Sequence, residues 1–197
     1  AKPPRLIFFQ QCMFHGWLPI PKAAPYDLIH VKNLMPDRGM ILRDSRLTNS
    51  GNKASYLSVH AGEVKVLGNS FGGGRGGAAI SAAAGTRLMI AENTFQEIVN
   101  PEGNAAVVLD ASGAEVSFKD NTLGIKSGVV RISNPLAAVV NGNSFHNPGA
   151  GPRLVVGEGP ALVTGNRFWG ITEEAGLRAG KNTITKDNLF IPHRSRQ

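Results

Sequence analysis

The sequence predicts an all-β solenoid, in which successive stretches of about 24 residues wind as coils stacked on one another. Three observations lead to this prediction. The 197-residue chain has only 18% charged residues but 24 glycines, which favours many short strands and turns over helical bundles. A motif of alternating aliphatic residues followed by Asn and Phe recurs along the chain, and a second strand-like stretch precedes each copy. A leucine-rich repeat would need a Leu-x-x-Leu-x-Leu frame, which is absent.

Each predicted coil begins with a strand that ends in a turn. These stretches are YLSVHAG (56–62), AAISAAAG (78–85), VVLDASG (107–113), VVRISNP (129–135), LVVGEG (154–159) and GLRAG (176–180). Gly or Pro falls seven or eight residues before the next Asn in every case, which is a turn signal.

The second strand carries the repeated motif. Its copies are ILRDSRL (41–47), VKVLGNSF (64–71), LMIAENTF (88–95), VSFKDNTL (116–123), VVNGNSF (139–145), LVTGNRF (162–168) and ITKDNLF (184–190). The anchor positions are Ser45, Asn69, Asn93, Asn121, Asn143, Asn166 and Asn188, spaced 22 to 28 residues apart. Residues five and three before the anchor and two after it are mostly apolar, so they are predicted to point inward and to stack on their equivalents.

The anchor Asn is predicted to point inward at a sharp corner. A buried amide without a partner costs about 1–3 kcal/mol, but an amide carries both a donor and an acceptor, so a column of them can pair with one another. The Phe that follows forms a second column. After it comes a loop of variable length, such as GGGRGG (72–77), which contains Arg75.

This pattern resembles the right-handed parallel β-helix of the pectin-lyase-like superfamily, with its asparagine ladder and aromatic stack. The copies that carry the resemblance cover about residues 40–190. The resemblance implies about seven coils over residues 40–197. Residues 1–39 do not follow the period, and we interpret them as an N-terminal cap or as the remnant of earlier coils, with Asn33 as an irregular corner.

Charge and cysteine content limit the function classes. The net charge of +7 suggests an anionic partner. Nucleic acid is not expected, because the basic residues are scattered and no zinc or aromatic RNA-binding motif is present. No run of apolar residues is long enough to predict a membrane span. The single cysteine, Cys12, excludes an intrachain disulfide. We favour a secreted, cell-surface or virion-associated location.

The superfamily contains polysaccharide lyases, hydrolases, tailspikes and non-catalytic proteins, so the resemblance leaves the activity open. No complete catalytic constellation is found. Metal-independent lyases use a Lys and an Arg as base and acid, and Lys126, Arg131 and Arg153 are the weak candidates for these roles. The alternative is that these three are solvated surface cations.

The leading hypothesis is a module for carbohydrate recognition or assembly, which binds an acidic polysaccharide along its outer surface. Its expected contacts are Lys126, Arg131, Arg153 and Arg178, with Trp169 or Arg75 of the 72–77 loop. A polysaccharide lyase or hydrolase, as a fragment of a longer enzyme, and a trimeric tailspike-like element are the alternatives.

Two further patterns lie around the repeat. Glu92 and Asp120 directly precede the anchor on adjacent coils, where they could hold Ca²⁺ or serve only as turn residues; no other cofactor is expected. Four residues before the anchor, the outward position is apolar in five of seven coils. These five residues are Ile41, Met89, Val139, Leu162 and Ile184. They suggest a face covered by a homotrimer or a partner domain, unless strand propensity alone explains them.

Overall fold

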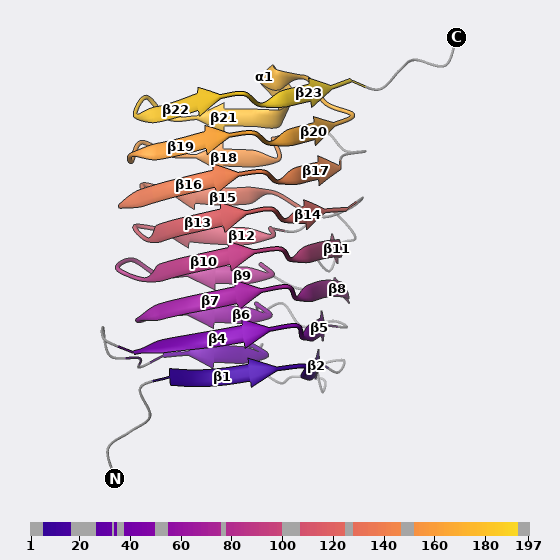
Figure 1. Cartoon of the computed structure of the whole chain (residues 1–197), viewed down its shortest axis with the longest axis vertical. Coiled ribbons are helices and arrows are strands. Elements are labelled where there is room, and N and C mark those ends of the chain that lie inside the picture. Colours follow the sequence, from indigo (N-terminus) through magenta and orange to yellow (C-terminus); the bar gives the residue numbers. More distant parts are fainter. Residues whose placement is uncertain are drawn as a thin grey trace.

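The computed structural model describes residues 6–16, 27–32, 34, 38–49, 55–75, 78–99, 107–124, 128–146 and 152–192. Over these residues the chain forms a parallel β-solenoid built from three sheets, which confirms the predicted all-β fold (Figure 1). Sheet A faces the viewer in Figure 1 and its strands point right, while the fainter sheet C behind it points left. Because the coils rise from the N-terminus to the C-terminus, the winding is right-handed.

Sheet A comprises, in spatial order, β1 (Leu6–Gln10), β4 (Gly39–Arg43), β7 (Glu63–Leu67), β10 (Arg87–Ala91), β13 (Glu115–Lys119), β16 (Ala137–Asn141), β19 (Ala161–Thr164) and β22 (Thr183–Lys186). Sheet B comprises β2 (Met13–Gly16), β5 (Arg46–Asn49), β8 (Ser70–Arg75), β11 (Thr94–Val99), β14 (Thr122–Leu123), β17 (Ser144–His146), β20 (Arg167–Trp169) and β23 (Leu189–Ile191). Sheet C comprises β3 (Ile29–Val31), β6 (Leu57–Val59), β9 (Ile80–Ala82), β12 (Leu109–Ser112), β15 (Val130–Ser133), β18 (Leu154–Val156) and β21 (Leu177–Ala179).

A single short helix, α1 (Glu173–Gly176), is found among the described residues, and it lies between β20 and β21. No helix in the described part of the chain is long and apolar enough to cross a membrane.

The register of sheet A produces the core. Val64 pairs with Leu88, and Val66 pairs with Ile90, on neighbouring strands. All four side chains are buried, while the residues between them face outward. The apolar positions of the repeated motif therefore point into the solenoid core, and the residues between them point outward.

The structure has one more coil at its N-terminal end than the seven anchors indicate. β1 pairs with β4 and β2 pairs with β5, in the same parallel register as later coils. Cys12 stands at the corner where later coils have Asn, and its backbone N–H donates to Ser45 Oγ over 3.0 Å. The period is hidden here because a cysteine replaces the asparagine and because the spacing to Ser45 is longer. Asn33, which was considered as an irregular corner, lies outside the described residues.

The asparagines form a hydrogen-bonded column at the corner between sheets A and B. From Asn69 to Asn166 they are at most 2% exposed. Each backbone N–H donates to the Oδ1 of the asparagine in the next coil, over 2.8–3.1 Å. Each Nδ2 donates to the same Oδ1 over 2.9–3.1 Å. A second bond runs back to a main-chain carbonyl of the preceding coil, as from Asn93 Nδ2 to Val66 O. Every buried amide is thereby paired.

Aromatic rings form a parallel stack beside this column. The rings of Phe145 and Phe168 lie 4.7 Å apart and nearly parallel, and Phe168 stacks equally on Phe190. Leu123 interrupts the column one coil before Phe145. In that coil Phe118, on the preceding strand, supplies the ring instead and lies 6.2 Å from Phe95.

The residues just before the asparagines adopt positive φ, which explains why they are Asp, Glu or Gly. Asp120 has φ of 52° and Gly142, one coil later, has φ of 69°. A Cβ on Gly142 would collide with Asp120 Oδ1, and one on Gly68 would lie 2.8 Å from Asp44 Oδ1. Asp44 and Asp120 therefore each require glycine at the same corner of the coil that follows.

Candidate functional site

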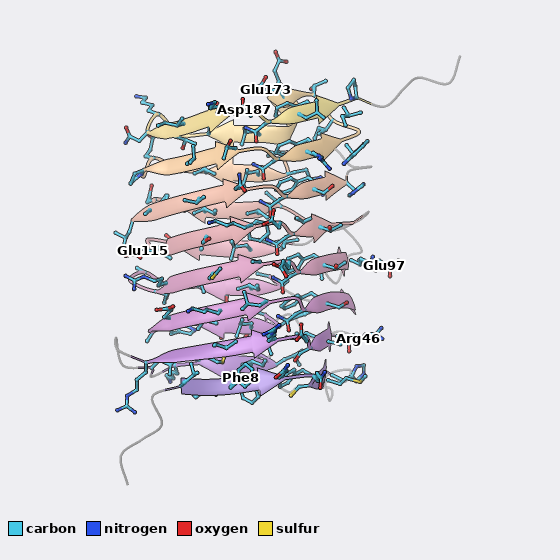
Figure 2. The ribbon with its side chains drawn as sticks, viewed as in Figure 1. Phe8, Arg46, Glu97, Glu115, Glu173 and Asp187 are labelled. Carbon is cyan, nitrogen blue, oxygen red and sulfur yellow. The ribbon has the colours of Figure 1, made fainter. Side chains whose placement is uncertain are left out.

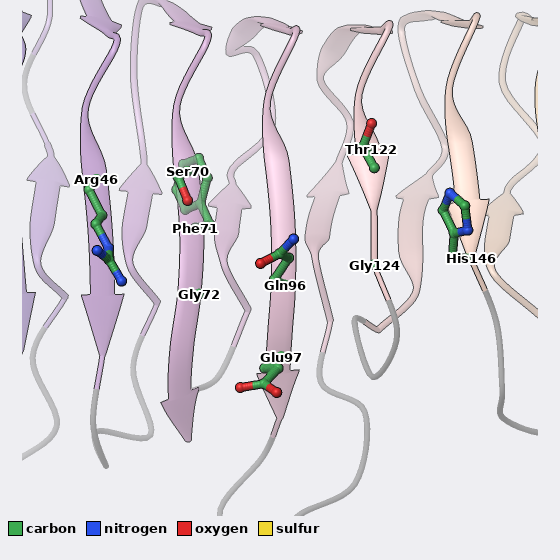
Figure 3. Close-up of a pocket in the computed structure, with 9 residues that line it drawn as sticks. All are labelled: Arg46, Ser70, Phe71, Gly72, Gln96, Glu97, Thr122, Gly124 and His146. Carbon is green, nitrogen blue, oxygen red and sulfur yellow. The ribbon is translucent and has the colours of Figure 1, made fainter.

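A hollow lies on the outer face of sheet B. This sheet B groove has a volume of about 530 Å³ (Figure 3). It is lined by Arg46, Ser70, Phe71, Gly72, Gln96, Glu97, Thr122, Gly124 and His146. It crosses five neighbouring strands, from β5 to β17, which is about 19 Å at the usual strand spacing.

The floor of the groove is low because the outward residues of sheet B are small. The residues directly after the anchor asparagines pair in register on successive strands. They are Ser70, Thr94, Thr122 and Ser144. Two positions further, Gly72 pairs with Gln96. Gly72 cannot be larger without displacing the backbone, since a Cβ there would lie 2.9 Å from Gln96 O.

Glu97 rises beside this floor because β11 is distorted at that point. Its φ is 52°, so two exposed side chains, Gln96 and Glu97, follow one another before Ile98 returns to the core. Figure 3 shows the Glu97 carboxylate near the lower rim of the groove, below Gln96.

The far end of the groove carries an aromatic platform. The rings of His146 and Trp169 are stacked with centroids 5.8 Å apart and planes 6° apart. Trp169 Nε1 donates to Ser144 Oγ over 3.1 Å, and that oxygen lies 3.1 Å from His146 Nε2. The indole remains 39% exposed, so its outer face is open to a ligand.

Positive charge flanks the groove. Arg46 lies at the near end, and Arg167 follows Ser144 in the outward column on β20. Both arginines are exposed. The groove lining itself holds one arginine, Arg46, and one acid, Glu97, and Arg167 adds a second arginine on the strand beyond the groove.

The predicted ligand-binding cations do not meet in this groove. Arg131 faces outward on sheet C, where its Nη1 lies 3.5 Å from Asp110 Oδ2. Arg178 is exposed two strands further along the same column. Lys126 lies outside the described residues, and Arg75 is placed in β8 without a described side chain.

Arg153 lies in the interior, not on the outer surface where a ligand contact was expected. It is 6% exposed, and burial lowers the pKa of its guanidinium. It directly precedes β18, at the place that Tyr56 and Ala79 take before β6 and β9. Of the predicted trio, Arg131 and Arg153 therefore do not share a surface.

Glu92 and Asp120, the candidate Ca²⁺ ligands, do not line the groove. Both residues have positive φ, and the Asp120 carboxylate reaches over Gly142 in the next coil, on the side away from Glu92. Among the described residues, no group of three or more His, Cys, Asp or Glu side chains is placed to hold a metal ion.

A second polar cluster lies on sheet C near the N-terminal end, and no repeat position predicted it. Asp27 accepts bonds from Ser55 N (2.9 Å) and Ser58 Oγ (2.5 Å), and its Oδ2 lies 3.1 Å from His30 Nδ1. The His30 ring stacks on His60 at 4.8 Å. The cluster borders a depression of about 520 Å³ that extends to Asp110. Its carboxylate fastens the first coil to the second.

Sequence reasoning included Trp169 but missed the groove residues themselves. A usable signal was present: the residue directly after the asparagine is Ser or Thr in four successive coils, from Ser70 to Ser144. Comparison of the chain with protein-family models, with curated proteins and with solved structures found no match.

Proposed function

We propose that this chain is a parallel β-helix of the pectin-lyase-like type that binds an acidic polysaccharide in the sheet B groove without cleaving it. The observation that carries the proposal is the groove itself: a low floor of small polar residues with Arg46 at one end and the Trp169 platform at the other. The asparagine column and the phenylalanine stack support the superfamily assignment.

The chemistry of the groove fits a chain of sugar acids. Guanidinium groups match carboxylates with paired hydrogen bonds, and Arg46 and Arg167 are exposed. The exposed indole face suits the apolar face of a sugar ring. Ser and Thr hydroxyls on the floor can exchange hydrogen bonds with sugar hydroxyls. A secreted, cell-surface or virion-associated location goes with this proposal, because acidic polysaccharides occur there.

Binding to polygalacturonate, with a neutral polysaccharide as control, tests the proposal. We expect affinity for the acidic polymer that falls as salt rises. Arg46→Gln should weaken binding about tenfold or more, because a hydrogen bond to a charged group is worth about 1.5–3 kcal/mol. Trp169→Ala removes the indole face and should weaken binding about two- to tenfold, at about 0.5–1.5 kcal/mol for an aromatic contact. Arg178→Gln makes the same charge change on sheet C and should leave binding nearly unchanged. Equal binding by all variants would contradict the groove assignment. Repeating the titration with Ca²⁺ and with a chelator tests any contribution from Glu92 and Asp120.

A polysaccharide lyase is the second candidate, favoured by one observation. Arg131 is held beside Asp110 at the border of the sheet C depression, where Asp27 and His60 supply further titratable groups. Cleavage of a uronate polymer would raise the ultraviolet absorbance through the unsaturated product. A rise that Arg131→Ala abolishes would replace the non-catalytic proposal.

We also propose that the outer face of sheet A is covered by another protein surface. The predicted apolar residues lie on this face, where Met89 and Leu162 are 38% exposed and Ile184 is 66% exposed. A trimeric tailspike-like assembly and a partner domain are two ways to cover it.

A further inference from the structure

The outer face of sheet A carries a continuous column of eight side chains, one from each strand. In spatial order they are Phe8, Ile41, Lys65, Met89, Ser117, Val139, Leu162 and Ile184. This outer column adds Phe8, 51% exposed, to the residues that the sequence indicated. Phe8 lies on the face toward the viewer in Figure 2.

We infer that a second copy of this chain covers the face, packed antiparallel about a two-fold axis that runs along the strands between Met89 and Ser117. This inference rests on the proposal that sheet A is a covered face. The axis falls between β10 and β13, the fourth and fifth of eight strands, so the two copies overlap over all eight.

The outer column is complementary to itself when it is reversed in this way. Phe8 faces Ile184 of the second copy, and Ile41 faces its Leu162. Lys65 faces Val139 of the second copy, where its aliphatic stem can cover the valine while its ammonium group stays with Glu63, 3.3 Å away. No two like charges oppose each other in the column.

The shape of the face agrees with this pairing. A depression of about 340 Å³ lies at the middle of the face, and Ser117, Ala137 and Val139 form part of its lining. Met89 also borders this depression and projects from it, 38% exposed. About this axis, Met89 of each copy lies over the Ser117 of the other, so each protruding thioether has a small residue opposite it.

The charges beside the column agree as well. Arg87 Nε lies 2.6 Å from Glu115 Oε2 within one chain, on the two strands next to the axis. Reversal places Arg87 opposite Glu115 of the second copy, and Glu115 opposite its Arg87. The two pairs form one cluster of four alternating charges. A two-fold axis along the solenoid would instead set Lys65 against Lys65.

The size of the face predicts a moderate affinity. Five-residue strands over seven spacings give a face of about 17 by 34 Å, or roughly 600 Å², somewhat below the area that each partner of a standard interface buries. We therefore expect a monomer–dimer equilibrium in the micromolar range or weaker, not a permanent dimer.

Sedimentation velocity over a rising concentration series tests the inference on the whole chain. The wild type should shift from monomer to dimer. Leu162→Asp should remain monomeric throughout, whereas Val155→Asp, at an outward position of sheet C, should dimerise like the wild type. Circular dichroism confirms that both variants are folded. A chain that stays monomeric at every concentration overturns the inference.

Crosslinking tests the orientation. In a Cys12→Ser background, Ile41→Cys and Leu162→Cys chains are each treated with a bis-maleimide that spans about 10 Å, the spacing of packed sheets. A crosslinked dimer should form when the two chains are mixed and not with either chain alone. Crosslinking of Ile41→Cys with itself, or of neither chain in a sample that dimerises, overturns the antiparallel geometry.

Discussion

Replacing Asn121 with alanine removes the middle of the asparagine column. Asn121 Oδ1 accepts from the backbone N–H of Asn93 at 2.9 Å and from its Nδ2 at 3.0 Å. Asn121 Nδ2 donates to Ile90 O at 3.0 Å and to Asn143 Oδ1 at 3.0 Å. Alanine provides none of these bonds, and the groups left behind are shielded from bulk water because the site is 1% exposed.

The expected cost follows from the groups left without partners. The Asn93 N–H loses its acceptor, while Asn93 Nδ2 keeps bonds to Val66 O and Ala91 O. Ile90 O loses the side-chain donor as well. At about 1–3 kcal/mol for each buried group left unpaired, the free energy of unfolding should fall by about 3 kcal/mol.

Denaturant unfolding followed by far-ultraviolet circular dichroism measures this loss. Asn188→Ala is the matched control, because Asn188 is the last described member of the column and is partly exposed. It should cost about 1 kcal/mol, since water can reach the groups it leaves. Equal losses for the two variants, or a loss below about 0.5 kcal/mol for Asn121→Ala, would refute the reasoning.

Three further predictions concern other parts of the fold. Burial raises the pKa of Tyr56 to about 12, so the stability it contributes is complete below pH 10 and is lost as pH rises toward 12. Tyr56→Phe should abolish this alkaline loss of stability. At pH 7 the substitution should be neutral or stabilising, because the buried Tyr56 hydroxyl has no hydrogen-bond partner among the described residues. An unchanged dependence of stability on alkaline pH would contradict this. Gly142→Ala should destabilise the chain by more than 1 kcal/mol in denaturant unfolding, and Asp120→Gly in the same chain should recover part of the loss; no recovery would exclude the clash as a cause. Phe145→Ala should cost about 3–5 kcal/mol in the same assay, and a loss below 1 kcal/mol would show that the stacked ring is not a core element.

The repeat was predictable because the solenoid uses the same positions in every coil. A residue that points inward in one coil stacks on its equivalent in the next. Six asparagines at similar spacing therefore predict that each coil turns at the same corner. For residues 1–39 the sequence left a cap and the remnant of earlier coils as alternatives. The first coil does not follow the period because Cys12, at the corner position, lacks the amide that marks the later corners.

The site was harder to predict because its parts come from positions without a repeated chemical identity. Ser70, Gly72 and Thr122 share only small size, and their role appears once the strands lie side by side. Arg153 lies outside the repeated motif, so nothing in its local sequence marks it as buried.

Hydroxyl-radical footprinting with saturating polygalacturonate tests the proposed binding most directly. Trp169 on sheet B and Met89 on sheet A are 39% and 38% exposed, which makes them a matched pair of oxidisable probes. Ligand in the sheet B groove should protect Trp169 from oxidation and leave Met89 as reactive as before. Unchanged oxidation of Trp169 at saturation would contradict the proposed site.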